Sequence, residues 1–375
     1  MCFASHKSRG GKSFNWLIVN DIQYSEMDSF LGMRILNIDV YLQSNLKTRI
    51  MKNKNKNRYL PGALGHIYHR GHNGYVVFYN VKDCLVFFTL FMLAAEKYRI
   101  RISGICLMYN HYHVDFEADD ARLIRRFVTY YCSRFSREYN ERYGLKGRLF
   151  DGYGLSNKRD DKARRTAYAY LYNNPVEWHI CHRAEQYMWN FLGYARDRNP
   201  IYGKVASRNM SRRLRRSLQM VSYLRSKGRP VLYGTLDTMM DGLKEKEKHY
   251  LADFIITEYS LIDFNRAISL YGTYDKMIDA FSNNTGNEYD VEEEFDPTAG
   301  SEYKRMANYL AKDKRYKDIG AVVSRPAEER LVYLNEIVDR CNVTVRHAQR
   351  FLRIPDAKPD DVDGSEAMGL ETLYP

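Results

Sequence analysis

The pattern of hydrophobic and polar positions is densest between residues 62 and 194, where strand-like runs alternate with helical ones. Runs rich in β-branched and aromatic residues predict strands over 65–70 and 75–79, on either side of a turn-prone Gly-His-Asn-Gly. The apolar stretch over 81–98 predicts a buried helix. Alternation and β-branched residues over 100–118 then predict a pair of strands.

Two more helices complete this region. Between residues 121 and 143, apolar side chains recur at helical spacing while arginines form a basic side, and Gly144 supplies a stop signal. A last helix is predicted over 162–174, ending at Pro175 because proline cannot continue the helical hydrogen bonds. Strands and helices mixed in this way predict a compact sheet domain of about 135 residues.

A separate helical pattern occurs near the C-terminus. Helices are predicted over 331–340 and over 344–353, with Thr344 as the N-cap of the second. The spacing suits a helix-turn-helix. Its second helix would present to a duplex four side chains, Arg346, Gln349, Arg350 and Arg353. The alternative is an ordinary helical hairpin.

Charge points to a polyanionic partner. The 375 residues include 58 Lys and Arg against 46 Asp and Glu, a formal net charge of +12. Residues 204–229 hold nine cations and no acid, which indicates either a phosphate-contacting surface or a solvated helix face. The acidic cluster over 288–296 is interpreted as a linker rather than a metal site, because charge blocks are usually solvated.

Other classes are excluded by composition. The longest apolar stretch is shorter than the ~20 residues of a membrane span, and no signal-peptide pattern precedes it. Six cysteines lie far apart without a CxxC pair, which fits reduced thiols. We therefore expect no membrane partner and a cytoplasmic location.

The chemistry-bearing residues form two constellations. His111 and His113 flank Tyr112, and in a strand side chains two apart point to the same face, so both imidazoles can reach one metal ion. By itself this pair is more often a coincidence, since a third ligand must come from elsewhere. Tyr170 and Asn174 are four apart, which places a phenol and an amide on one helix face.

Five ordered segments share a pattern that is much more specific than either pair. They are Gly65–Asn73, with an "RGN"-like end, Cys106–His113, similar to "CLMPNHxH", Gly147–Phe150, Tyr170–Val176, similar to "YIxxNPV", and the tryptophan segment Ala184–Phe191. Together they resemble the single-tyrosine HUH transposases, in the branch of REP-associated tyrosine transposases. Tyr109 stands where that family usually has proline, and Asn190 where serine is usual.

The resemblance implies an α+β fold, with a ferredoxin-like HUH domain built on an antiparallel sheet. The C-terminal pattern adds the expectation of an all-α region with a helix-turn-helix after it. It also implies a metal-dependent DNA strand transferase. Tyr170 would be the nucleophile of a 5′-phosphotyrosine intermediate, while His111, His113 and Asn174 would hold Mg²⁺ or Mn²⁺.

The substrate implied is single-stranded or hairpin DNA, because the attacking helix needs an exposed phosphate. Seven arginines in or near the domain are expected to contact DNA, with solvated helix faces as the equally weighted alternative; they are Arg70, Arg125, Arg126, Arg134, Arg137, Arg164 and Arg165. In the C-terminal helix the expected contacts are Arg346, Gln349 and Arg350.

Four other histidines are not expected to bind metal. His66 and His69 are three apart in a predicted strand and would face opposite sides, and His179 with His182 lacks partners. Two other functions remain: a catalytically silent DNA-binding regulator, and a replication initiator or relaxase of the same superfamily. The sequence does not decide the oligomeric state.

The expected domain organisation follows these patterns. Residues 1–58 are expected to be an extension, or to precede a true start at Met51. The catalytic domain is expected over 59–200, and a basic helical region with an acidic linker over 201–300. The helix-turn-helix-like module is expected over 301–354, and a disordered acidic tail over 355–375.

Overall fold

The structure is a computed structural model that describes residues 58–283, 298–313, 315 and 319–355. The expected N-terminal extension, the acidic cluster over 288–296 and the expected C-terminal tail lie outside the described residues, apart from Arg58 and Pro355. All described residues belong to one of the two compact units into which the chain divides, the unit over 56–375.

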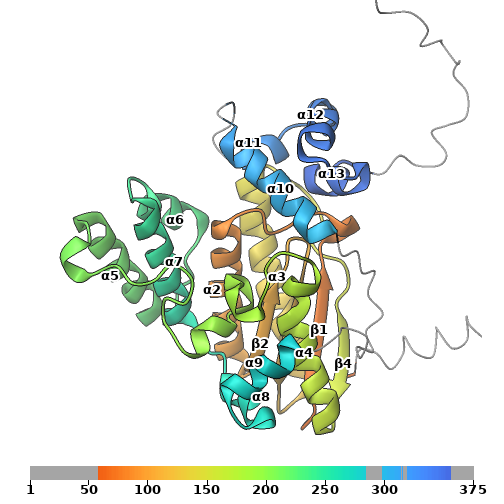
Figure 1. Cartoon of the computed structure of the whole chain (residues 1–375), viewed down its shortest axis with the longest axis vertical. Coiled ribbons are helices and arrows are strands. Elements are labelled where there is room, and N and C mark those ends of the chain that lie inside the picture. Colours follow the sequence, from red (N-terminus) through yellow and green to blue (C-terminus); the bar gives the residue numbers. More distant parts are fainter. Residues whose placement is uncertain (1–57, 284–297, 314, 316–318, 356–375) are drawn as a thin grey trace, which may run out of the picture. The chain divides into compact units, whose positions relative to one another are not determined.

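A four-stranded antiparallel sheet forms the centre of the fold, with the strand order β2-β3-β1-β4 (Figure 1). The strands are β1 (Leu64–Arg70), β2 (Arg101–Leu107), β3 (His111–Glu117) and β4 (Gly154–Lys158). Two helices connect them in the chain order β1–α2–β2–β3–α3–β4, and they are α2 (Val81–Tyr98) and α3 (Ala121–Tyr143). This order is the ferredoxin-like arrangement, so the predicted α+β class with an antiparallel sheet is confirmed.

Ten further α-helices follow β4 in the described part of the chain. They are α4 (Asp161–Glu177), α5 (Arg212–Ser226), α6 (Tyr233–Met240), α7 (Glu245–Tyr259), α8 (Phe264–Tyr271), α9 (Tyr274–Ser282), α10 (Ala299–Lys312), α11 (Gly320–Val323), α12 (Ala327–Cys341) and α13 (Val345–Leu352). Among the described residues, we find no helix with the length and apolar character needed to cross a membrane.

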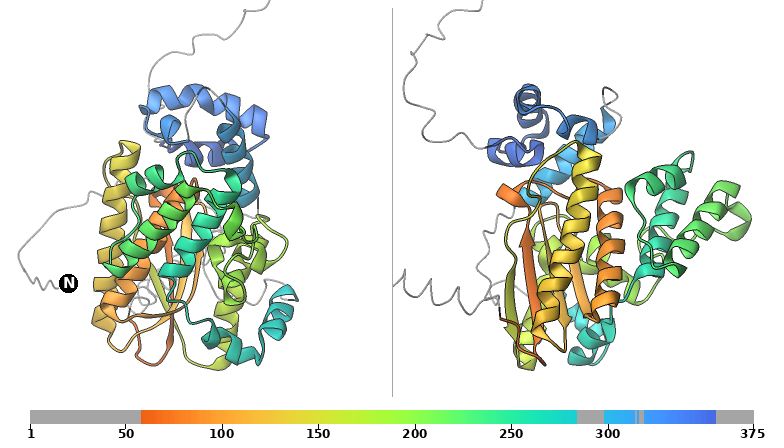
Figure 2. Two further views of the ribbon diagram at one scale, coloured as in Figure 1. Left: turned by 90° about the vertical axis from the view of Figure 1, so that its left-hand side faces the viewer. Right: turned by 180° about the vertical axis from the view of Figure 1, so that it is seen from behind.

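The two faces of the sheet differ in chemistry because side chains alternate along each strand. Tyr112 of β3 packs against α2 and α3, with its ring 4.8 Å from that of Phe87 and its hydroxyl 2.8 Å from that of Tyr131. Figure 2 shows α2 and α3 side by side over this face. The other face lies against α4, which packs on β2 and β3.

The close approach of α4 depends on one glycine. A β-carbon on Gly104 of β2 would lie 3.3 Å from Leu171 of α4. That separation is tighter than an ordinary van der Waals contact, so a β-carbon there would require Leu171 to shift by a few tenths of an ångström. The glycine therefore leaves room for Leu171 between α4 and β2.

Several sequence predictions are confirmed by the element bounds. The helix predicted over 121–143 is α3, and Gly144 ends it in the left-handed conformation with φ 61°. The helix predicted over 81–98 is α2, which begins with a capping box formed by Asn80 and Asp83. Apolar spacing and capping residues mark the same helix ends, so these boundaries could be predicted from the sequence.

Two predicted elements differ from the structure. Residues 75–79 join no strand, although residues 76–79 are buried, because their N–H groups pair elsewhere: those of Val77 and Phe78 donate to the carbonyl of Tyr109, at 2.8 and 3.0 Å. The last helix does not end at Pro175, since α4 continues to Glu177. Proline in the last turn leaves later bonds intact, and the N–H of Trp178 donates to Asn174 at 3.0 Å.

The last four helices, α10 to α13, are called the C-terminal module here. Its final helix is anchored to the segment before α2, where the Tyr79 hydroxyl donates to the carbonyl of Phe351 at 2.6 Å. Arg353 donates to the carbonyl of Val76 at 3.0 Å and lies over the Tyr75 ring. Arg353 is only 9% exposed, so the expectation that it faces a duplex is wrong. It serves instead to satisfy a buried carbonyl.

We expect Tyr79→Phe to lower the melting temperature by roughly 2–4 °C, because it leaves the Phe351 carbonyl without its donor at a cost of about 1 kcal/mol. The matched control is Tyr223→Phe, since Tyr223 is 52% exposed. Thermal unfolding followed by circular dichroism measures both variants. Equal melting temperatures for the two would contradict the anchoring role of Tyr79.

Candidate functional site

The pairing of β1 with β3 gathers polar side chains on the face of the sheet that α4 covers. In this antiparallel ladder the directly opposed residues are His66 with Asp115, Tyr68 with His113, and Arg70 with His111. Opposed residues project to the same face. Six side chains from two strands therefore form one polar strip, in which Tyr68 and Arg70 are half-buried and the other four are buried.

Helix α4 lays a second row of side chains along this strip. Tyr170, Asn174 and Trp178 follow one another at intervals of four residues, which places them on one helix face. The Tyr170 ring lies 5.0 Å from that of His113, and the Trp178 ring lies 5.1 Å from that of His111, measured between centroids. Asn174 lies between these two contacts.

The predicted metal ligands are brought together. Nε2 of His111 lies 3.3 Å from Oδ1 of Asn174, and Nε2 of His113 lies 3.4 Å from Nδ2 of the same carboxamide. Two imidazole nitrogens and one amide group thus converge on one point between β3 and α4. Imidazole and carboxamide together suit Mn²⁺, and Mg²⁺ prefers the oxygen.

The contacts of the two ring nitrogens of His111 fit a cation at this point. Its Nδ1 faces Oδ1 of Asn110 at 2.8 Å, and the Asn110 amide is oriented by its donation to the carbonyl of Gly74. Its Nε2 faces Oδ1 of Asn174. A neutral imidazole has one N–H, so one of these contacts opposes two lone pairs. A cation between Nε2 and Oδ1 would relieve that repulsion.

The site is closed in this conformation. His111, His113 and Asn174 are 1%, 0% and 1% exposed, and Tyr170 is 7% exposed. Burial, followed by the neighbouring His111 and His66, holds the pKa of His113 well below its ordinary value of 6.5. His113 is therefore neutral near pH 7, the form in which an imidazole binds a metal ion.

The candidate ligand set consists of two imidazoles and one amide, with no acidic or thiol side chain among the three. Within the described ranges, no group of three or more His, Cys, Asp or Glu side chains is arranged to hold a metal ion. His69 lies apart, because its Nδ1 accepts from the Tyr112 hydroxyl at 2.6 Å on the opposite face of the sheet.

His66 is the residue that sequence reasoning missed. The expectation that His66 and His69 face opposite sides of β1 is confirmed, yet His66 faces the site itself. Its Nε2 lies 3.1 Å from Nδ1 of His113, and its Nδ1 lies 2.7 Å from Oδ1 of Asp115. The available signal was the period of two along both strands, but it needed the β1–β3 register to be interpreted.

Most of the predicted DNA-contacting arginines lie away from this strip. Four of them belong to α3, on the opposite face of the sheet: Arg125, Arg126, Arg134 and Arg137. Two others lie in the first turns of α4 and donate to backbone carbonyls, Arg164 to Gly62 and Arg165 to Leu270. The structure does not bring these six side chains to the tyrosine and histidines.

Two predicted arginines from distant parts of the chain do meet near the site. A β-carbon on Gly74 would lie 2.8 Å from a guanidinium nitrogen of Arg70 and 3.2 Å from Nε of Arg350. Gly74 is also the residue whose carbonyl accepts from Asn110, the neighbour of His111. Arg70 and Arg350 together are called the arginine pair below.

The C-terminal helices have a definite arrangement, but a helix-turn-helix is not established. Thr344 caps α13 as predicted, its hydroxyl accepting from the N–H of His347 at 3.3 Å. Arg346 is exposed, whereas Gln349 and Arg350 are half-buried. The backbone carbonyl of Arg350 accepts from Val76 at 3.3 Å, so this end of α13 is fixed to the segment between β1 and α2.

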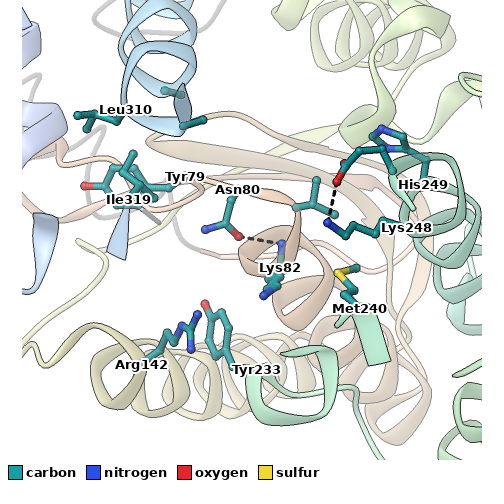
Figure 3. A pocket seen from close by; sticks show the side chains of 14 residues that line it. Tyr79, Asn80, Lys82, Arg142, Tyr233, Met240, Lys248, His249, Leu310 and Ile319 are labelled. Atoms are coloured by element: carbon teal, nitrogen blue, oxygen red, sulfur yellow. Dashed lines mark hydrogen bonds and ion pairs between the residues drawn. The ribbon is translucent and has the colours of Figure 1, made fainter. Parts of the chain in front are cut away.

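A cleft of about 320 Å³ lies elsewhere, between the start of α2, α6, α7 and α10 (Figure 3). Its cations are paired within the protein: Lys82 and Arg142 with Asp237, and Lys248 with Glu245. None of the tyrosine, histidine and asparagine side chains of the candidate site lines it. Internal pairing leaves this cleft little charge to attract an anion.

Comparison with known proteins finds one distant structural likeness and no family. No protein-family model matches the sequence, and no curated protein matches it. Among solved structures, the chain has a distant likeness to one described as "Structure of the REP associates tyrosine transposase bound to a REP hairpin". The identity is 15% over 37% of this chain and 82% of the other, with a TM-score of 0.30. A TM-score this low carries no argument about function.

The neutral His69 predicts a pH dependence of stability. Burial lowers its pKa to about 4 from the ordinary 6.5. Because the unfolded chain binds a proton below pH 6.5 and the folded protein does not, this contribution to stability falls as the pH drops from about 6.5 to 4. The slope approaches about 1.4 kcal/mol per pH unit.

We expect His69→Gln to show a shallower loss of stability than the unaltered protein over this pH range, as measured by urea unfolding at several pH values. His182→Gln is the control, since His182 is exposed and should leave the slope unchanged. Identical slopes for His69→Gln and the unaltered protein would show that His69 is not buried in its neutral form.

Proposed function

We propose that this chain is a metal-dependent, single-tyrosine DNA strand transferase of the HUH type that cleaves single-stranded or hairpin DNA. The observation that carries the proposal is the convergence of both His Nε2 atoms on the Asn174 carboxamide, beneath the helix that also carries Tyr170. The five ordered sequence segments that resemble the single-tyrosine HUH transposases support it independently.

The reaction assigns one role to each side chain. His111, His113 and Asn174 would hold the divalent ion, and the ion would polarise the scissile phosphodiester as a Lewis acid. The Tyr170 phenol loses its proton and its oxygen bonds to phosphorus, while the 3′-oxygen of the DNA leaves and takes up a proton. The product is a 5′-phosphotyrosine and a free 3′-hydroxyl.

Strand transfer is the reverse of this step with another 3′-hydroxyl. That hydroxyl attacks the phosphotyrosine, forms a new phosphodiester and returns the proton to the Tyr170 phenol. The covalent link conserves the energy of the broken bond, so no nucleotide cofactor is needed. Since the ligands and Tyr170 are nearly buried, DNA entry requires the covering side chains to move.

The arginine pair supplies a route for the DNA backbone. Arg70 lies opposite His111 in the β1–β3 ladder, and Arg350 reaches the same place from α13. Both guanidinium groups lie beside Gly74, and phosphates bind guanidinium groups through paired hydrogen bonds. We therefore propose that the strand entering the site passes along this pair, with the C-terminal module as one wall.

The decisive test is a covalent adduct. Purified protein with Mn²⁺ or Mg²⁺ is incubated with labelled single-stranded hairpins taken from the DNA that flanks its gene. We expect a metal-dependent adduct through the 5′-phosphate at the break, with a free 3′-hydroxyl on the other fragment, and we expect it to be lost completely in Tyr170→Phe. Tyr168→Phe is the matched control, since Tyr168 is also buried in α4 and should leave the adduct in place.

Two outcomes would sink the proposal. Tight hairpin binding without an adduct in any variant would favour the silent DNA-binding regulator. An adduct that survives Tyr170→Phe would show that another residue is the nucleophile.

The route along the arginine pair predicts the salt dependence of binding. Arg70→Gln and Arg350→Gln should each weaken binding of a single-stranded oligonucleotide and reduce the slope of log K against log salt by about 0.7. Arg137→Gln is the comparison, because Arg137 is exposed on α3 over the opposite face of the sheet. Fluorescence anisotropy over a salt series measures all three. A reduced slope for Arg137→Gln alone would place the DNA on α3.

A further inference from the structure

We infer that Asp115 and His66 are positioning residues that fix the orientation and tautomer of His113, so that its Nε2 lone pair points at the candidate metal position. This inference rests on the proposed function and deepens it. The observation behind it is an unbroken row of contacts from Asp115 through His66 to His113 and on to Asn174.

The direction of each hydrogen bond in this row follows from its acidic end. A carboxylate only accepts, so Nδ1 of His66 donates its proton to Oδ1 of Asp115, 2.7 Å away. With Nδ1 as its protonated nitrogen, His66 has a lone pair on Nε2, and in the inferred arrangement this lone pair accepts from Nδ1 of His113, 3.1 Å away. His113 in turn keeps a lone pair on Nε2, the atom that faces the Asn174 amide nitrogen.

The row leaves the Nε2 lone pair of His113 available to a metal ion. A ligating histidine usually donates its other ring N–H to a fixed acceptor, which sets the ring orientation and raises the basicity of the ligand. Here the acceptor is itself an imidazole backed by a carboxylate. His66 cannot be an additional ligand in this arrangement, because its Nε2 is directed at the far nitrogen of His113.

The cost of this arrangement argues against a purely structural role. His66 is 3% exposed, while His113 and Asp115 are fully buried in the middle of the sheet. Oδ2 of Asp115 is buried and makes no hydrogen bond within the described residues, so His66 is the side chain that engages this carboxylate. Apolar residues of similar volume would stabilise such a core position at least as well.

The test compares Mn²⁺ affinity with stability. The double variant His66→Leu with Asp115→Leu removes the polar row and fills the core with apolar side chains. We expect its melting temperature to be maintained or raised and its Mn²⁺ dissociation constant, measured by electron paramagnetic resonance titration, to rise about tenfold or more. Asp115→Asn, which keeps an acceptor oxygen, should lie between the double variant and the unaltered protein.

Ser103→Ala is the matched control. Ser103 is 2% exposed and donates to the backbone carbonyl of Asp115 at 3.2 Å, not to its carboxylate. We expect its Mn²⁺ affinity to be unchanged. A folded double variant that binds Mn²⁺ within twofold of the unaltered protein would overturn the inference while the proposed function stands. Unaltered protein that binds no Mn²⁺ would refute the proposed metal site and this inference together.

A second measurement needs no variant. Long-range proton–nitrogen correlation spectra of histidine-labelled protein without metal report which ring nitrogen carries the proton. We expect His113 and His66 both to be protonated at Nδ1. Protonation of His113 at Nε2 would overturn the inference, because that tautomer has no lone pair to offer a metal ion.

Discussion

The antiparallel pairing of β1 with β3 is the constraint on which the site depends. Its register places His66 opposite Asp115 and Arg70 opposite His111, so two strands that are 40 residues apart in sequence share one polar strip. Because strand side chains alternate with a period of two, a slip of one residue would move the whole strip to the face covered by α2 and α3. The apolar packing of Tyr112 on that face holds the register.

The second constraint is the position of α4 over this strip. Gly104 lets the helix approach the sheet, and helical spacing then sets Tyr170 and Asn174 over the two histidines. The C-terminal module acts on the same region from another side. Its last helix, α13, is hydrogen-bonded to the segment between β1 and α2, so Arg350 and Arg70 both lie beside Gly74. The arginine pair and the ligands are thus held by one set of contacts.

Buried polar side chains at the site lower the stability of the fold. A carboxylate, three imidazoles and a carboxamide occupy core positions of the sheet and α4, where apolar side chains would stabilise the fold more. Such groups persist in a fold when their mutual geometry is required. Asp83 is another buried carboxyl, outside the candidate site. Burial raises its pKa to about 6, and two tyrosine hydroxyls donate to it.

The local elements and the chemical types of the site residues could be predicted from the sequence alone. Apolar spacing and capping residues located α2 and α3, while the His111–His113 and Tyr170–Asn174 spacings indicated which side chains share a face. Only the tertiary structure decided which faces meet. His66 joined the site through strand register, Arg353 turned inward to a buried carbonyl, and the α3 arginines fell on the opposite face. The physical reason is that periodicity fixes a side chain's direction within its own element, whereas contacts between elements depend on register, close approach and the burial of distant partners.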